Sequence, residues 1–573
     1  MIWIFPILVP LLAALLVALP VRKWLLPMCP LPALWLALFG PADGGADVEW
    51  LLLGTRFGFG AAGQIFLLFT SVLWLVAGIY GMGYLKGDPR RVRFDGFFLL
   101  TMTGNFGLIL ARDVPGFYTF FALMTFSGFG LVIHAGTAAA LRAARIYLIT
   151  AVAGEAMLLG AIFLAVGAAE SVRLEDLGPA VAASESRNLI IFLAFFGFGV
   201  KAGVLPLHFW LPLAHPVAPV PASAVLSGAM IKAGLLGWLH FLPLGHGVFP
   251  GWGIFCIFAG MVAALGAVVV GTMQNDPKTT LAYSSVSQMG VMTLILGVGL
   301  TIPGVWPAAL PVLLLYALNH ALAKGALFFG AGVAHSTGGG GRWWVMAGLA
   351  LPALVVAGAP WTGGSMMKYA IKDLIAGLPV WLVPWLDWLL PLSSAATTLL
   401  LGRFLWLVWR DMGGRQEGRA HPLMWASWVG LLGGVAAAVL FAIRHYALEI
   451  ASTPFSLVVL WGNVWPILLG LALLLGLGRG SIRARPLVPP GDLVVWLERL
   501  LGRMRRIKGF LPGPSRWKIN LFEPLEHLAE SERRRDLTNR MEERMRHRSV
   551  PGVLFVLLVL ALVALLIFGT PAR

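Results

Sequence analysis

The chain has 573 residues, of which 59% are hydrophobic and only 12% are charged. A soluble globular domain carries about 25% charged residues, and the mean hydropathy of +0.84 is also far from that class. The two cysteines are too few for a thiolate zinc site or a cysteine-ligated iron–sulfur cluster, each of which needs about four thiolates. The composition excludes an ordinary soluble enzyme and predicts an all-α polytopic membrane protein.

Apolar runs of the length needed to cross a bilayer, about 20 residues, follow one another along the chain. The first run precedes Arg22 and Lys23, which is the reverse of a cleavable signal peptide, so we predict a retained first span. Further spans are predicted near residues 24–40, 64–85, 96–111, 114–134, 146–169, 189–213, 217–242, 249–273, 280–302, 304–334, 343–377, 379–409, 424–447, 455–477 and 550–568. The total is about sixteen transmembrane helices.

The net charge of +16 is concentrated beside the spans. Residues 478–548 hold 17 Lys/Arg and 9 Asp/Glu, which accounts for half of the excess. Basic loops on the cytoplasmic side explain such a charge, so no nucleic-acid partner is expected. The loops on one side of the membrane carry thirteen basic residues, and those on the other side carry six. The more basic set is assigned to the cytoplasm, which predicts a cell inner membrane protein with both termini outside. Segment 478–548 is then cytoplasmic and is expected to contact anionic lipids or a neighbouring subunit.

Ionisable side chains stand inside several predicted spans. Inserting one charged side chain into the middle of a membrane costs about 2.5–3.5 kcal/mol, so such a residue is expected to have a structural or functional role. A lysine near a helix end can extend its amine to the interface, His320 alone can be a packing residue, and Glu155 can pair with a lysine for structure only. His320 and Lys324 are four residues apart and share a helical face, which favours a polar path. The candidates are Glu155, Lys201, Lys232, His320, Lys324 and Lys368.

Two predicted spans also contain helix-breaking residues. Pro206 and Pro212 interrupt the span of Lys201, and Pro360, Gly363 and Gly364 interrupt that of Lys368. Broken helices at matching positions of two halves indicate ion sites in transporters, although a packing kink has the same signature.

Four stretches resemble the antiporter-like membrane subunits of respiratory complex I, Mrp sodium/proton antiporters and group 4 membrane-bound hydrogenases. They are KAGVLPLHFWLPLAHPVAPVPASAVLSGAMIKAG (201–234), DPKTTLAYSSVSQMG (276–290), NHALAKGALF (319–328) and GAPWTGGSMMK (358–368). The resemblance implies two inverted five-helix repeats with broken helices 7 and 12. The expected segments are spans 1–3 (1–95), the first repeat (96–242), the second repeat (249–409), spans 14–15 (424–477), the cytoplasmic segment (478–548) and a last span (549–573).

The resemblance also assigns roles to residues. Lys201 becomes the central lysine of helix 7, Lys232 that of helix 8, His320 and Lys324 the connecting groups of helix 11, and Lys368 the terminal site of helix 12, with His208 and His215 as accessory residues. Two positions depart from the family: the helix-5 glutamate falls on Ala122, and an aspartate is replaced by Leu213. Glu155 is the nearby acid expected to substitute, within about 4–6 Å of Lys201 or through one water.

The predicted function is a proton-translocating subunit of a multisubunit membrane complex, coupled to a partner redox module. No cofactor or metal site is expected in the chain itself, so whether it counts as an enzyme depends on the complex. Three alternatives stay open: a Na⁺/H⁺ antiporter subunit of the Mrp type, the membrane subunit of an energy-coupled inorganic-carbon uptake complex with a soluble zinc hydratase, and an inert scaffold. The sequence alone does not separate H⁺ from Na⁺.

Overall fold

The computed structural model describes residues 2–18, 22–41, 44–49, 51–52, 54–337, 339–413, 418–446 and 457–478, with residues 488, 489, 491 and 495. Most of the predicted cytoplasmic segment and the predicted last span lie outside the described residues.

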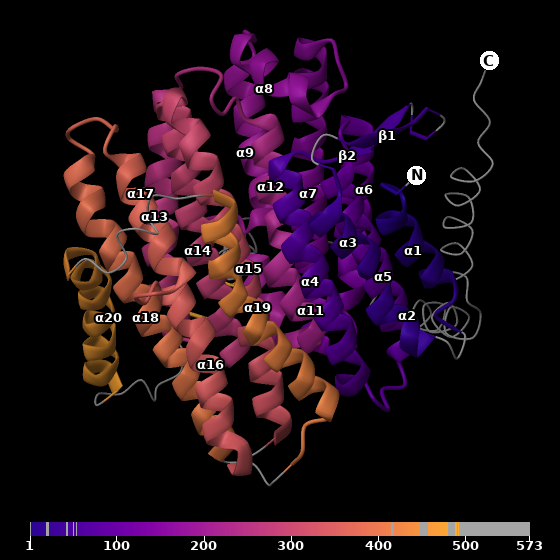
Figure 1. Ribbon diagram of the computed structural model, residues 1–573, viewed down its shortest axis with the longest axis vertical. Coiled ribbons are helices and arrows are strands. Elements are labelled where there is room, and N and C mark those ends of the chain that lie inside the picture. Colours follow the sequence, from indigo (N-terminus) through magenta and orange to yellow (C-terminus); the bar gives the residue numbers. More distant parts are fainter. Residues whose placement is uncertain are drawn as a thin grey trace, which may run out of the picture. The chain divides into compact units, whose positions relative to one another are not determined.

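The described chain is helical apart from one hairpin (Figure 1). Nine of its helical segments are long and apolar enough to cross a membrane, so the predicted all-helical polytopic class is confirmed. The helices are α1 (Phe5–Leu15), α2 (Arg22–Met28), α3 (Leu31–Phe39), α4 (Ala61–Tyr84), α5 (Arg91–Leu110), α6 (Val114–Val132), α7 (Ala138–Ala169), α8 (Leu174–Ala183), α9 (Arg187–Ala202), α10 (Trp210–Val217), α11 (Val220–Val225), α12 (Ile231–Phe241), α13 (Pro250–Thr272), α14 (Pro277–Thr301), α15 (Trp306–Thr337), α16 (Arg342–Ala357), α17 (Gly363–Ile375), α18 (Val383–Gly413), α19 (Pro422–Tyr446) and α20 (Leu457–Gly478).

Helices α14 and α15 form the interior of the described bundle. Every residue from 279 to 301 of α14 is buried, and α15 is buried along its apolar span. By contrast, α7 and α13 present apolar side chains outward, including Phe163 (73% exposed) and Phe258 (70% exposed). Such surfaces are unfavourable in water and suit lipid or another membrane subunit.

Two helices are broken beside a lysine. Helix α9 ends at Ala202, Gly203 adopts a left-handed φ of 71°, and a short 3-10 turn (Leu207–Phe209) leads into α10. Helix α16 ends at Ala357, Gly358 has φ 82°, and α17 begins at Gly363. A left-handed residue is strained with a β-carbon, which explains glycine at both ends.

One predicted interruption is wrong. Pro212 lies in the first turn of α10 and breaks nothing, because the first N–H groups of a helix have no intrahelical partner. The structure adds an irregularity that the sequence did not reveal: a π-helical turn (Leu226–Met230) between α11 and α12. Such turns shift carbonyl groups out of the regular hydrogen-bond ladder.

A two-stranded antiparallel hairpin corrects the expectation that every element is helical. Strand β1 (Gly45–Val48) pairs with β2 (Thr55–Gly58). The buried side chains of Val48 and Phe57 anchor it to the bundle. The hairpin satisfies the backbone groups of a long connection between α3 and α4, where no helix supplies partners.

Asp113 fastens this hairpin to the start of α6. Its carboxylate accepts hydrogen bonds from the backbone N–H of Arg56 and of Gly116, each at 2.7 Å. The second bond is an N-cap of the helix.

We predict that Asp113→Ala lowers the free energy of unfolding by about 1–2 kcal/mol, because both bonds to a buried carboxylate are lost. Thermal unfolding of the purified protein in detergent measures the change. Asp47→Ala is the control, since Asp47 makes only an exposed ion pair with Arg56 and such pairs contribute little. Equal unfolding temperatures for the two variants would contradict the prediction.

Candidate functional site

Lys201 lies in the last turn of α9, with 5% of its surface exposed. Its Nζ donates to the Tyr147 hydroxyl at 3.1 Å and lies over the rings of Tyr147 and Phe121, 5.3 and 5.7 Å from their centroids. The Tyr147 hydroxyl donates in turn to the carbonyl of Thr125 at 2.8 Å. Tyr147 is therefore the direct partner of Lys201, a role that the sequence did not indicate.

Glu155 lies beside the same small cavity as Lys201 and interacts with that lysine electrostatically. Glu155 and Lys201 both line this cavity of about 20 Å³. No hydrogen bond joins their charged groups, and the side chains of Thr125 and Tyr118 on α6 also interact with the Glu155 carboxylate. A volume of about 10–15 Å³ holds one water, so the cavity has room for a water bridge. The substitution of Glu155 for the missing helix-5 glutamate stays a prediction that this arrangement supports.

Ala122, the position of that missing glutamate, lies on α6 and is half-buried. Helix α6 instead contributes Phe121 and Thr125 to the cavity. The side of Lys201 that faces α6 is therefore lined by an aromatic ring and a hydroxyl-bearing side chain.

Leu213, the second departure, lies on α10 and is buried. A β-carbon on Gly491 would meet Leu213 at 2.9 Å, so the two are in close contact, and Gln274 donates to the carbonyl of Val488 at 3.1 Å. The chain after α20 thus returns to α10, and the leucine supplies an apolar contact there.

Three more predicted residues meet in the centre of the bundle. Lys232 and Lys324 are fully buried. The Lys232 amine donates to the carbonyl of Ser227 at 2.7 Å, within the π-helical turn, and the Lys324 amine donates to the carbonyl of Leu281. Lys324 and Lys232 interact electrostatically with each other and with His320. In a medium of low dielectric constant, a proton on one such group disfavours a proton on the next.

The two accessory histidines are also buried. His215 stacks against Phe328 with centroids 4.8 Å apart and interacts electrostatically with Lys324, Lys278 and Lys232. Its ring nitrogens, like those of His320, have no hydrogen-bond partner among the described residues. His208 packs against Tyr283 at 6.0 Å. His215 thus belongs to the central group, while His208 lies beside it.

Lys368 ends the series on α17 and is half-buried. Its amine donates to the carbonyl of Ala357 at 2.7 Å and to the Ser394 hydroxyl at 2.9 Å. Ala357 is the last residue of α16, so the helix break frees that carbonyl. Lys368 borders two cavities: one of about 10 Å³ shared with His320, and one of about 90 Å³ shared with Lys372.

A hydrogen-bonded group beside Lys368 was also absent from the sequence prediction. The Tyr316 hydroxyl donates to Gln288 at 2.6 Å, and the Gln288 amide donates to Thr397 at 3.2 Å. Tyr316 and Gln288 line the same small cavity as His320 and Lys368. Gln288 lies within residues 276–290, one of the stretches that resemble the antiporter-like subunits, and this resemblance could have pointed to it.

A wider cavity of about 710 Å³ is lined by residues close in the chain to His215. Residues 216–220, which follow His215 directly, form part of its wall. Its polar lining includes Asp88, His134, Asp276 and Lys278, and Lys278 donates to the carbonyl of Ala218 at 2.7 Å. Polar groups therefore line a wide cavity whose wall includes the residue that follows His215.

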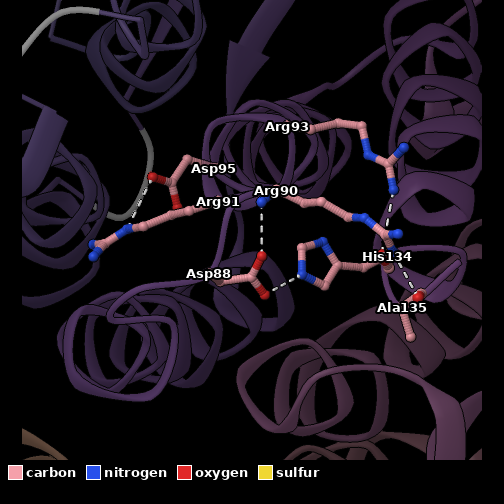
Figure 2. A network of polar contacts seen from close by, with 7 residues as sticks. All are labelled: Asp88, Arg90, Arg91, Arg93, Asp95, His134 and Ala135. Atoms are coloured by element: carbon pink, nitrogen blue, oxygen red, sulfur yellow. Dashed lines mark hydrogen bonds and ion pairs between the residues drawn. The ribbon is translucent and has the colours of Figure 1, made fainter. Parts of the chain in front are cut away.

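The mouth of this cavity is held by a network drawn in Figure 2. Asp88 accepts hydrogen bonds from the His134 ring at 2.9 Å and from the N–H of Arg90 at 2.7 Å. The Arg90 guanidinium donates to the carbonyls of His134 and Ala135 at 3.2 and 2.6 Å, and Arg93 also reaches the His134 carbonyl. The network ties the α4–α5 loop to the turn after α6.

Asp88 is held in its ionised form by this network. Burial opposes ionisation, but the hydrogen bonds from His134 and Arg90, together with their charges, outweigh it and lower the pKa of the carboxyl below its ordinary value of 3.8. A group with a lowered pKa stabilises the fold above its unfolded pKa and loses that effect as the pH falls through the folded value.

We predict that Asp88→Asn lowers the unfolding temperature at neutral pH but has much less effect at an acid pH well below 3.8, the ordinary pKa of the carboxyl, where the wild-type carboxylate is itself protonated. Thermal unfolding in detergent across this pH range measures the difference. The exposed Asp373→Asn serves as control. A destabilisation by Asp88→Asn that is the same at both pH values would show that the charge contributes nothing.

The fold and the row of amines define a class of multi-pass antiporter-like membrane subunits. Residues 111–353 match the family described as NADH:quinone oxidoreductase/Mrp antiporter, transmembrane. This segment is similar to that family, so the resemblance predicted from the sequence is confirmed over these residues.

Two curated proteins illustrate the similarity. Hydrogenase-4 component B of Escherichia coli is 33% identical over 282 residues, which cover 46% of this chain and 41% of that protein. The Na⁺/H⁺ antiporter subunit A1 of Staphylococcus aureus is 30% identical over 288 residues, 48% of this chain and 36% of that protein. The matched segments thus span less than half of these relatives.

Two solved structures share the fold. The Mrp complex of a Dietzia species matches with a TM-score of 0.71 at 23% identity, covering 100% of this chain and 64% of that chain. The membrane-bound sulfane sulfur reductase, an archaeal respiratory membrane complex, matches with a TM-score of 0.65 at 19% identity, covering 82% of this chain and 98% of that chain.

Proposed function

We propose that the chain is a proton-translocating subunit of a multisubunit membrane complex. The observation that carries the proposal is the series of amines and imidazoles from Lys201 through Lys232, Lys324 and His320 to Lys368, whose amines are held by backbone carbonyls or hydroxyls. Such groups are expensive in lipid and can pass protons along hydrated gaps. The relatives named above, an antiporter subunit and a hydrogenase component, support the same function.

The proposed path has a cavity at each end. In this proposal protons arrive through the cavity of about 710 Å³, whose wall includes residues 216–220, and leave through the cavity of about 90 Å³ beside Lys368. The basic loops are assigned to the cytoplasm, so the first cavity, which these loops help to line, faces the cytoplasm in this proposal. The same assignment places both termini outside. The glycine breaks beside Lys201 and Lys368 support the proposed inverted repeats, 96–242 and 249–409, with the remaining predicted segments flanking them.

Protons are favoured over Na⁺ as the transported ion. The described residues that line the small cavity between His320 and Lys368 include no carboxylate, whereas Na⁺ favours oxygen ligands and carboxylates above all. The driving partner in this proposal is a redox module carried by neighbouring subunits. The exposed apolar faces of α7 and α13 supply surface for such neighbours.

We predict that Lys201→Met abolishes proton transport by the reconstituted complex, because the amine that carries the proton is removed while its aliphatic volume is kept. A pH-sensitive dye in sealed vesicles measures uptake, and subunit stoichiometry on a native gel reports assembly. Lys86→Met, an exposed loop lysine, is the matched control. Normal transport by Lys201→Met in an intact complex would favour the inert scaffold.

At the far end, we predict that Lys368→Met reduces transport at least about tenfold, whereas Ser394→Ala reduces it only about two- to threefold. Ser394 supplies one of two acceptors for the Lys368 amine, and the Ala357 carbonyl stays in place. The same vesicle assay compares them. A larger loss in Ser394→Ala than in Lys368→Met would rule out Lys368 as the proton-carrying group.

A further inference from the structure

The amine of Lys201 has two oxygen partners on one helix. Tyr147 and Glu155 both lie on α7, eight residues apart, which corresponds to about 12 Å along the helix axis. Lys201 bonds to the Tyr147 hydroxyl and shares the cavity of about 20 Å³ with Glu155. A flexible lysine side chain between two such groups can change partner by rotating its own torsions.

The Tyr147 hydroxyl is built to accept a hydrogen bond from that amine. Its own proton is committed to the Thr125 carbonyl at 2.8 Å, so its lone pairs face Lys201. Trp210 packs edge-to-face on the tyrosine ring with centroids 5.1 Å apart. A β-carbon at Gly128 would lie 3.0 Å from the hydroxyl oxygen, so glycine leaves room for it.

We propose that Tyr147 is a positioning residue that holds Lys201 away from Glu155 until the amine is released. This inference rests on the proposed function. Glu155 is the one charged group besides Lys201 in the described lining of the cavity; Phe121 and Thr125 from α6, Val200 from α9 and Trp210 from α10 are neutral.

When Lys201 turns towards Glu155, a proton can cross directly or through one water. An N–H bond of the ammonium breaks, an O–H bond of the carboxyl forms, and both groups become neutral. The exchange leaves no net charge in a region of low dielectric constant, which lowers its cost. Return of the amine to Tyr147 then separates it from the loaded carboxyl.

The decisive variant is Tyr147→Phe, which keeps the ring and removes only the hydroxyl. Glu155 is then the remaining charged partner of Lys201, and the pair stays closed. Thr125 and Tyr118 of α6 also face the Glu155 carboxylate. We expect proton uptake by vesicles containing the full complex to fall about tenfold at alkaline pH, where Glu155 is ionised, and by less as the pH is lowered until Glu155 binds a proton and the pair opens. A purely structural defect would not depend on pH in this way.

A double-mutant cycle separates positioning from packing. Because Tyr147 acts by keeping Lys201 from Glu155, Tyr147→Phe should cause no further loss in a Glu155→Gln background. Tyr80→Phe is the matched control: it also removes a buried tyrosine hydroxyl, which donates to the Phe329 carbonyl at 3.1 Å, remote from this site in the sequence. Its transport should be unchanged.

Wild-type uptake by Tyr147→Phe, or losses that multiply with those of Glu155→Gln, would overturn the inference. The proposed function has its own test, since it fails if Lys201→Met transports normally. A complex that is inactive as Lys201→Met and fully active as Tyr147→Phe would therefore reject the positioning role alone.

Discussion

Buried amines in this bundle need acceptors, and irregular helices provide several of them. Most carbonyls of a regular helix already accept a backbone hydrogen bond, so a buried amine finds few free acceptors there. The Leu281 carbonyl of α14, which accepts from Lys324, is an exception. Here the π-helical turn presents the Ser227 carbonyl to Lys232, and the end of α16 presents the Ala357 carbonyl to Lys368. At the helix break beside Lys201, the amine donates to the hydroxyl of Tyr147 instead of to a backbone carbonyl. The breaks and the lysines therefore depend on one another.

Lysines could be predicted as site residues because a charge inside an apolar run is costly and stands out. Lys201, Lys232, Lys324 and Lys368 all lie in the interior or beside internal cavities. Tyr147 carries no such signal, because a tyrosine in an apolar helix is ordinary and its contact with Lys201 joins residues 54 apart. The same holds for Gln288, whose partner Thr397 lies 109 residues away.

Helix breaks were predictable only in part. Glycine at 203 and 358 marks real ends because the backbone there is left-handed. A proline does not by itself predict a helix break, because Pro212 lies in the first turn of α10, where its missing N–H costs nothing. The π-helical turn and the hairpin leave no local pattern, since the first arises from packing and the second from pairing across a short connection.

The two ends of the amine series differ in how their lysines are held. Lys368 bonds to a carbonyl and a hydroxyl and shares a cavity with Lys372, so nothing in its described hydrogen bonds opposes release of a proton. Lys201 faces a neutral hydroxyl on one side and a carboxylate on the other. Only at the Lys201 end can a change of partner alter the charge seen by the amine. Both alternatives lie on α7, whose outer face is apolar and exposed. A subunit that packed on this face would contact the helix that carries both of these partners of Lys201.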